Sequence, residues 1–383
     1  MVKQYMWAGF GVIVAGIGLL DVFFTILHYD GFGIISSRFY RLFWGGLRWL
    51  TDPFPKRISE FWRSLGTPLM IPATLLLWLG LVTVGFACMY YPFMHAEYFS
   101  LPDYMGGRAG FFDAIFFSGI SLTTVGYGDI VPRNSFFQCA AVVEGLVGFS
   151  IITLAISYVL NIYQVVQRMS VMAAELRHES GSTRNTQNIL LMRFCRDETG
   201  SIEAYMRNLH RNLVAYYESL RHYPITYYFY SRRAYLSIPY VFYTIGGVLA
   251  SLRWGLPTNQ PASQNSSLLM LYAGYSEIIN RMQRQFLPHH PTQPIEAVDH
   301  ETFKKAFNNA QASLPGHVNT FLRLNSRMQD IAAIEPSTVE DAYRRYKNWL
   351  QFAGTVDWFV HFTAKELGYS PQDISGEQDI AMV

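Results

Sequence analysis

Charged residues are scarce in this sequence. Of its 383 residues, 15% are charged and 50% are hydrophobic, whereas a soluble globular domain carries about 25% charged residues. The shortage is concentrated at one end, because 19 of residues 1–168 are charged, against 39 of residues 169–383. This composition excludes a single soluble domain, and it also excludes a disordered or fibrous chain.

Cysteine and net charge are equally low. The three cysteines, Cys88, Cys139 and Cys195, lie far apart. Their spacing excludes a disulfide framework and a zinc site, so we expect three small buried hydrophobic residues. The net charge of +2 predicts no nucleic-acid partner. Metalloprotease, serine-hydrolase, dinucleotide-binding and EF-hand motifs are missing, and we therefore expect no enzyme activity and no cofactor.

Long uncharged runs, in contrast, are abundant. A bilayer core of about 30 Å needs roughly 20 helical residues to cross it. Three runs of this chain reach that length, residues 4–27 (with one carboxylate, Asp21), 64–96 and 134–167 (with one carboxylate, Glu144). The sequence therefore predicts three transmembrane helices.

The first run also has features of a signal peptide, because Lys3 precedes an apolar stretch. No small-residue cleavage site follows it, however, and the apolar character continues past Asp21, so we expect a retained span. Gly11, Ala15 and Gly18 share one face of this helix, which predicts close packing against another helix.

Basic residues indicate the orientation. Residues 30–66 carry six basic and three acidic side chains, which places this connection on the cytoplasmic side. Residues 97–109 contain a single arginine and are expected outside. The N-terminus is then expected outside, and the chain after Arg168 is expected in the cytoplasm. We expect the protein in the plasma membrane or, in a bacterium, the inner membrane.

The basic connection itself has an amphipathic pattern. Arg38, Arg41 and Arg48 fall on one side of a helix, and the rest is covered largely by Phe39, Leu42, Phe43, Leu47 and Trp49. This pattern predicts a helix that lies on the inner leaflet and contacts membrane lipid. A voltage sensor is the alternative, but it needs arginines at every third residue through a span. Here that spacing breaks after two, and too few spans precede it.

A short apolar segment followed by glycines separates the second and third spans. Residues 111–122 can enter a membrane but are too few to cross it, and irregular backbone after them must line a cavity or be buried in protein. Gly126 and Gly128 tolerate positive φ, so that successive carbonyls of residues 123–129 can face one axis. The side chains of Val125 and Tyr127 then point back into the protein. Rings of such carbonyls can replace the hydration shell of a cation.

Residues 123–129, Thr-Thr-Val-Gly-Tyr-Gly-Asp, resemble the selectivity filter of potassium channels, and residues 67–165 resemble the two-helix pore module of that family. The resemblance implies that K⁺ is the transported ion and that four chains surround one pore. It further implies that the ion is coordinated by the carbonyls of Thr124, Val125, Gly126 and Tyr127, with the Thr124 hydroxyl at the innermost site. Thr123, Gly128 and Asp129 would support the filter, with Asp129 at its outer mouth.

The resemblance also places an inner-helix hinge at Gly148. After it, hydrophobic residues recur every three or four positions on one face: Phe149, Ile152, Ile156 and Leu160. We interpret them as the lining of a cavity and an inner gate, where a hydrophobic constriction can close a pore by dewetting. Ordinary helix packing is the alternative for each.

Two positions depart from the family pattern. Ile120 stands where many simple two-helix channels have a glutamate behind the filter, so no carboxylate is available there. Phe116 and Phe117 replace a tryptophan pair and offer no N–H donor to Tyr127. We expect Ser121 to donate in its place.

Glu144 is the only ionisable residue in the inner helix. A carboxylate near the middle of a membrane is costly and is often functional. Two interpretations remain open, a buried protonated or hydrogen-bonded group that orients the pore helix, and a pH sensor that modulates the channel. For Asp21 in the first span, we expect a partner at the inner interface, either His28 or an arginine of the connection.

The remaining residues, 169–383, have a helical pattern with polar breaks at 179–186, 257–267 and 288–294. A capping box at Ser337–Glu340 predicts the start of a long helix. Residues 234–252 are uncharged, and we expect a buried helix there rather than a fourth span. The pair His289 and His290 lies between prolines and is expected in a solvated loop. No ligand-binding module is recognisable, so the sequence names no gating ligand.

The predicted fold is an all-α membrane protein in four parts. These are an N-terminal transmembrane helix (1–29), a cytoplasmic basic linker (30–66), a pore module (67–168) and a helical cytoplasmic domain (169–383). The predicted function is a homotetrameric potassium-selective channel, gated at the inner helices and modulated by the cytoplasmic domain. Two alternatives are a non-conducting membrane sensor that uses the pore as a scaffold and a potassium transporter subunit. A transporter, however, would carry four linked pore segments in one chain.

Overall fold

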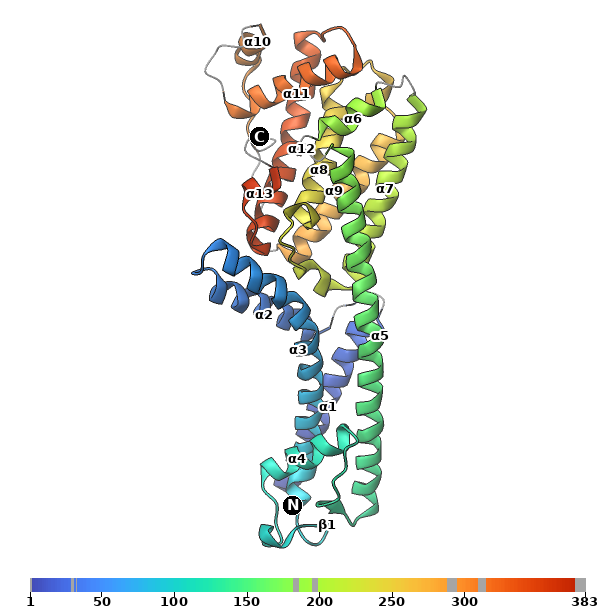
Figure 1. Ribbon diagram of the computed structural model, residues 1–383, viewed down its shortest axis with the longest axis vertical. Helices are drawn as coiled ribbons and strands as arrows, with labels where there is room; N and C mark the ends of the chain where they lie inside the picture. The colour runs from blue at the N-terminus through green and yellow to red at the C-terminus, as the bar shows by residue number, and fades with distance from the viewer. Residues whose placement is uncertain are drawn as a thin grey trace. The chain divides into compact units, whose positions relative to one another are not determined.

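The computed structural model describes residues 2–28, 31, 33–181, 186–194, 199–287, 295–308 and 315–375. These residues are mostly helical, and the strands they contain form one two-stranded sheet, so the predicted all-α class is confirmed. The chain divides into two compact units (Figure 1). The first comprises Met1–Val166 and Leu220–Phe229, and the second comprises Gln167–Ser219 and Tyr230–Val383.

Three helices of the chain are long and apolar enough to cross a membrane. They are α1 (Val2–Ile26), α3 (Lys56–Tyr90) and α5 (Ser135–Glu179), and they confirm the three predicted spans. Helix α3 begins eight residues before the uncharged run. Pro55, with φ −53°, precedes its first residue, a position that suits proline because the N–H groups of a first helical turn have no intrahelical partner.

Helices α1 and α3 pack backbone to backbone. A Cβ atom on Gly11 would lie 2.4 Å from the Gly85 carbonyl oxygen, and one on Gly85 would lie 2.5 Å from the Ala15 backbone nitrogen. The predicted small-residue face is therefore confirmed. Because lipid tails are as apolar as the side chains, such close packing is what holds membrane helices together.

Asp21 is fully buried in this unit and binds the start of helix α2 (Ser36–Thr51). Its carboxylate accepts hydrogen bonds from the Ile35 backbone N–H (2.6 Å), from the Ser36 N–H and hydroxyl, and from Trp78 Nε1 (2.8 Å). The expected pairing with His28 or an arginine is therefore wrong. Backbone N–H groups at a helix start are unpaired and carry partial positive charge, so they can stabilise the carboxylate as a cation would.

Helix α2 is held by its neighbours within the first unit. Its buried Tyr40 lies with its hydroxyl 3.4 Å from that of Tyr158 on α5, and its buried Trp44 packs on Tyr228. The connection to α3 is fixed by an ion pair between Arg63 and Asp52, at 2.5 Å. The predicted amphipathic helix therefore exists.

Residues Leu220–Phe229 belong to the first unit although they follow a long segment of the second. They contain the 3₁₀ turn η3 (Pro224–Tyr228). The Thr67 hydroxyl donates to the Tyr228 carbonyl at 2.9 Å, and the rings of Tyr223 and Tyr158 lie 5.7 Å apart. This segment therefore contacts α3 at Thr67 and α5 at Tyr158.

The second unit is a helical domain built around α8 (Ile238–Ala250), all of whose residues are buried. It continues into a π-helical turn, η5 (Ser251–Gly255). The expectation of a buried helix at this position is confirmed. The end of α5, from Gln167, also belongs to this unit. The other helices of the unit are α6 (Gln187–Phe194), α7 (Thr199–His222, whose last turn belongs to the first unit), α9 (Ser266–Phe286), α10 (His300–Asn308), α11 (Gly316–Ala332), α12 (Val339–Leu367) and α13 (Pro371–Ser375).

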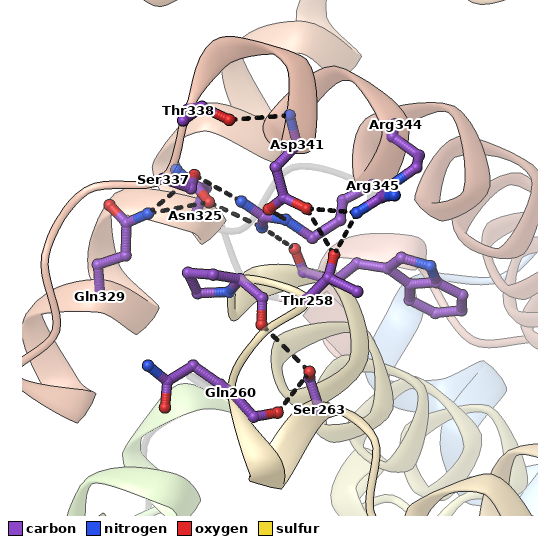
Figure 2. A network of polar contacts seen from close by, with 12 residues as sticks. Thr258, Gln260, Ser263, Asn325, Gln329, Ser337, Thr338, Asp341, Arg344 and Arg345 are labelled. Carbon is purple, nitrogen blue, oxygen red and sulfur yellow. Dashed lines mark hydrogen bonds and ion pairs between the residues drawn. The ribbon is translucent and has the colours of Figure 1, made fainter.

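A buried polar network joins α11, α12 and the turn after α8 (Figure 2). The Arg345 side chain donates to Asp341, to the Trp254 carbonyl, to Asn325 and to Ser337. All these contacts lie within the second unit. The buried guanidinium is therefore compensated, as a buried charge must be.

The start of α12 differs by one residue from the prediction. Thr338, not Ser337, is the N-cap, and its hydroxyl accepts from the Asp341 backbone N–H. The Ser337 hydroxyl accepts from Arg345 and Gln329 in the network. The predicted capping box is therefore wrong in its residues, although the long helix does follow.

The cysteines follow the expectation only in part. Cys88 is buried, as expected, but Cys139 is exposed, because it lies on the outer side of α5 in the isolated chain. Cys195, like His289 and His290, lies outside the described residues.

Candidate functional site: the pore helix and the filter segment

Helix α4 (Phe111–Leu122) has the twelve residues expected for a re-entrant helix. It starts where the Asp113 carboxylate accepts from the Gly110 backbone N–H at 2.7 Å, an acidic first turn that favours a helix N-terminus. Its buried face, which includes Ala114 and Phe117, packs on α3. The strands β1 (Phe99–Ser100) and β2 (Val131–Pro132), one before α4 and one after it, pair antiparallel.

The backbone after α4 alternates in handedness. Thr124, Gly126 and Gly128 have φ values of 60°, 54° and 82°, whereas Val125 and Tyr127 are not among the residues with positive φ. The glycines were expected to adopt this conformation. Thr124 was not, because a side chain makes it unfavourable, and no residue type in the sequence signals it.

Hydrogen bonds to the end of α4 hold this alternating backbone. The Thr124 N–H donates to the Ser121 carbonyl at 3.1 Å, and the Gly126 N–H donates to the Ile120 carbonyl at 3.2 Å. Both acceptors belong to the last turn of a helix, where carbonyls have no intrahelical partner. The position of α4 therefore sets the position of residues 123–126.

The side chains of this segment lie mostly uncovered in the single chain. Val125 is 53% exposed and Tyr127 is 73% exposed. The Tyr127 ring stacks on that of Phe116, with centroids 6.3 Å apart. Ser121 contacts the segment through its carbonyl, and no hydrogen bond from its hydroxyl to Tyr127 occurs among the described residues. The Asp129 carboxylate accepts from the Ile130 backbone N–H.

Helix α5 approaches the end of α4 through two glycines. A Cβ atom on Gly148 would lie 1.8 Å from the Leu122 carbonyl oxygen, and one on Gly145 would lie 3.4 Å from the Ser121 carbonyl oxygen. Gly148, assigned above as a hinge by resemblance, lies within an unbroken helix. In this conformation its lack of a side chain is required for packing.

The four residues assigned to the cavity and gate share an exposed face of α5. Phe149, Ile156 and Leu160 are each at least 60% exposed, and Ile152 is 39% exposed. Packing against helices of the same chain therefore does not explain them. They stay available to line a cavity or to contact other chains.

Glu144 is fully buried between three helices. The Tyr90 hydroxyl, at the end of α3, donates to its carboxyl group at 2.9 Å. The Ser118 hydroxyl, on α4, lies within hydrogen-bond distance of both Glu144 and the Thr83 carbonyl oxygen. Sequence reasoning singled out Glu144 but missed Ser118 and Tyr90. The available signal was the Ser118 hydroxyl in the apolar run of α4, where Ser121 offers another.

No group of histidine, cysteine and acidic side chains that could hold a metal ion occurs in the part of the chain that the structure describes.

Comparison with known proteins gives a match at this site. Residues 73–165 match the family model described as "Ion channel". They run from within α3 through residues 123–129, the filter segment, to α5. An uncharacterized membrane protein of Bacillus subtilis (strain 168), YdjJ, is 27% identical over 165 residues, which cover 41% of this chain and 46% of that protein. A voltage-gated potassium channel of Aeropyrum pernix is 35% identical over 65 residues, which cover 17% of this chain and 22% of that protein.

The matched regions span less than half of the length of these relatives. No solved structure gives a significant match to this chain.

Proposed function

We propose that this chain, a membrane protein whose residues 73–165 are an ion channel domain, is one subunit of a homotetrameric potassium-selective channel. Ions would cross passively through a filter of backbone carbonyls from Thr124, Val125, Gly126 and Tyr127. Conduction of this kind involves no chemical step on a substrate.

The alternating backbone of residues 124–128 is the observation that carries the proposal. Left-handed φ at every second residue, Thr124, Gly126 and Gly128, is the pattern that lets successive carbonyls face the same side. Carbonyl oxygens arranged in rings can replace the water around a dehydrated K⁺ ion. An ordinary glycine-rich turn does not need left-handed φ at three alternate positions such as 124, 126 and 128.

Four copies are proposed because one chain supplies a single filter segment. Apolar side chains of this unit are uncovered in one chain, including Phe112, Val142 and Leu146 as well as Val125 and Tyr127. An exposed apolar face of this extent favours contact with other chains. Fourfold assembly would cover it and would place the four filter segments around one axis.

The gate is proposed at the inner end of α5. The exposed face formed by Phe149, Ile152, Ile156 and Leu160 would line the cavity below the filter. Narrowing of this hydrophobic lining would expel water and stop conduction. The segment Leu220–Phe229 contacts this part of α5 at Tyr158, which gives the rest of the chain a direct route to the gate.

The orientation and the membrane are part of the same proposal. The basic residues of α2 and its flanks favour a cytoplasmic position for residues 30–66. The N-terminus would then lie outside the plasma or inner membrane, and the second unit would lie in the cytoplasm. A transporter subunit is less compatible, because the chain has one filter segment. A non-conducting sensor would not need an intact filter.

Potassium flux from vesicles tests the proposal. Purified protein in vesicles loaded with both K⁺ and Na⁺ should release K⁺ but not Na⁺, and Ba²⁺ should block the release. Gly126→Ala should abolish selective release, because alanine strains a backbone with φ 54°. Gly80→Ala is the matched control, since a Cβ atom there meets nothing within 4 Å. Wild-type vesicles that release neither ion, or both equally, would overturn the proposal.

A further inference from the structure

Three helices meet at Glu144 behind the filter segment. The carboxyl group, on α5, contacts Tyr90 on α3 and Ser118 on α4. Ser118 in turn contacts the Thr83 carbonyl on α3. All three side chains lie in the first unit, and Ser118 and Glu144 have no exposed surface.

The hydrogens in this cluster can be counted. There are three close contacts between oxygen atoms, Tyr90 to Glu144, Ser118 to Glu144 and Ser118 to Thr83. Tyrosine and serine hydroxyls bring one hydrogen each, and a carboxylate brings none. An ionised Glu144 would therefore leave one contact as two acceptors facing each other. A neutral carboxylic acid supplies the third hydrogen.

With that third hydrogen, each contact has one donor. Tyr90 donates to one Glu144 oxygen, the Glu144 acid donates to the Ser118 hydroxyl oxygen, and Ser118 donates to the Thr83 carbonyl. A neutral acid also suits a position inside a membrane, where an unpaired charge is expensive. The chain of donors has a direction, from Tyr90 on α3 to Glu144 on α5, then to Ser118 on α4 and back to the Thr83 carbonyl on α3.

The cluster is connected to the filter through α4. Ser118 lies two and three residues before the carbonyls of Ile120 and Ser121, which hold the N–H groups of Gly126 and Thr124. Gly145, next to Glu144, keeps α5 close to the Ser121 carbonyl. A shift of α4 relative to α5 would therefore move the anchors of the filter backbone.

Aromatic packing keeps the Tyr90 hydroxyl in place. Its ring lies 5.1 Å from the ring of Phe117 and 6.2 Å from that of Phe137, within a buried hydrophobic cluster. A ring held by its neighbours on both sides directs its hydroxyl without a further entropic cost. The Tyr90 hydroxyl is therefore a donor of fixed position for the Glu144 carboxyl oxygen.

We propose that Glu144, as a neutral acid, is a positioning residue for ion selectivity, and that Tyr90 and Ser118 act with it as a brace between the inner, pore and outer helices. This inference rests on the proposed channel function. It assigns to Glu144 the support that Ile120, an apolar residue, cannot give behind the filter.

The test is the K⁺/Na⁺ permeability ratio of purified tetramers in planar bilayers, from reversal potentials. Glu144→Gln should retain the wild-type ratio, because its amide oxygen accepts from Tyr90 and its NH₂ group donates to Ser118. Glu144→Leu, with similar size and no hydrogen-bonding group, should lower the ratio by about tenfold or more, because it loses the contacts to both Tyr90 and Ser118 and the loss of one buried hydrogen bond already corresponds to about tenfold. Ser157→Ala, on the same helix but bonded only to its own turn, is the matched control.

Two milder variants keep the test informative should Glu144→Leu fail to fold. Tyr90→Phe and Ser118→Ala each remove one oxygen atom, and each should lower the ratio. Either change should add little to Glu144→Leu, because residues acting as one unit are not additive.

The outcomes separate the brace from the channel function itself. A wild-type protein without selective K⁺ current would remove the channel function on which the brace depends. A selective wild type whose Tyr90→Phe, Ser118→Ala and Glu144→Leu tetramers keep the same ratio would overturn the brace alone. Loss of selectivity in Glu144→Gln would overturn the neutral-acid assignment.

Discussion

The carbonyl oxygen of Leu122, the last residue of the pore helix, occupies the place where a side chain on Gly148 would begin. A Cβ atom there would lie 1.8 Å from that oxygen, far inside van der Waals contact. The inner helix thus rests directly on the backbone of the pore helix, one turn below Glu144. Contact between two backbones leaves no flexible side chain to absorb a change.

Gly148→Ala should therefore displace α4 from α5 and abolish selective K⁺ flux. The physical reason is that neither the helix backbone of α5 nor the Leu122 carbonyl can move aside without loss of the filter anchors. Flux from vesicles and size-exclusion chromatography of the detergent-solubilised protein measure the effect. Gly119→Ala is the control on the pore helix, since a Cβ atom on Gly119 meets nothing within 4 Å. Equal flux from Gly148→Ala and wild type would contradict the close contact.

The α1–α3 interface should be equally sensitive to size. Gly11→Leu places a side chain against the Gly85 carbonyl, at 2.4 Å from its Cβ position, and should lower the melting temperature of the purified protein by several degrees. Gly9→Leu, at a position with open space, should leave it unchanged. Thermal unfolding followed by circular dichroism compares the two, and equal melting temperatures would argue against backbone-to-backbone packing.

Asp21→Ala should destabilise the first unit by about 3 kcal/mol, since it leaves buried donors at the start of α2 and on Trp78 without an acceptor. Asp21→Asn should cost less, because the amide oxygen still accepts. The checks are denaturant unfolding and the fluorescence of the tryptophans. Identical stabilities of the alanine variant and the wild type would show that Ile35, Ser36 and Trp78 find other acceptors.

Some parts of the membrane unit could be predicted from the sequence and others could not. The spans and the pore helix are visible because uncharged runs of a given length have few alternatives in a membrane. The left-handed backbone at Gly126 and Gly128 is visible because glycine permits it. Thr124 is not, since its conformation accompanies two hydrogen bonds to the end of α4, from the Thr124 N–H to the Ser121 carbonyl and from the Gly126 N–H to the Ile120 carbonyl. The local amino-acid composition reveals neither of these two hydrogen bonds.

Partners that are distant in sequence were equally hidden. For Asp21 the sequence suggested a cationic partner, but in the structure its partners include backbone N–H groups at the start of α2. Backbone N–H groups occur in every sequence, so no residue type marks these as the partners. At the start of α12, Ser337 and Thr338 are both good caps, and only the path of the chain decides between them. The return of Leu220–Phe229 to the first unit depends on contacts such as that between Thr67 and Tyr228, which no periodicity encodes.

Acid should weaken the second unit at the network around Arg345. Burial alone would raise the pKa of Asp341, but hydrogen bonds from Thr258, Arg345 and Arg344 lower this pKa below its ordinary value. A carboxylate with a depressed pKa in the folded state stabilises the fold above the ordinary aspartate value of about 3.9, and this contribution is lost as the pH falls below it.

Amide hydrogen exchange of α11 and α12 in the full chain, followed from pH 6 to pH 3, measures that loss. The protection of these helices, corrected for the intrinsic exchange rate, should fall in acid. Asp341→Asn should be less protected at pH 6 and should show a smaller fall, because it has no carboxylate to protonate. A wild-type fall no larger than that of Asp341→Asn would contradict the role of this carboxylate.

The reversal potential of the wild-type protein in a planar bilayer tests the central claim most directly. With K⁺ on both sides and Na⁺ balancing the ionic strength, the reversal potential should shift by about 59 mV for each tenfold change in the K⁺ gradient. That result would show that the protein conducts K⁺ selectively, as we expect of a filter at residues 124–127. A reversal potential that stays near zero while current flows would contradict it.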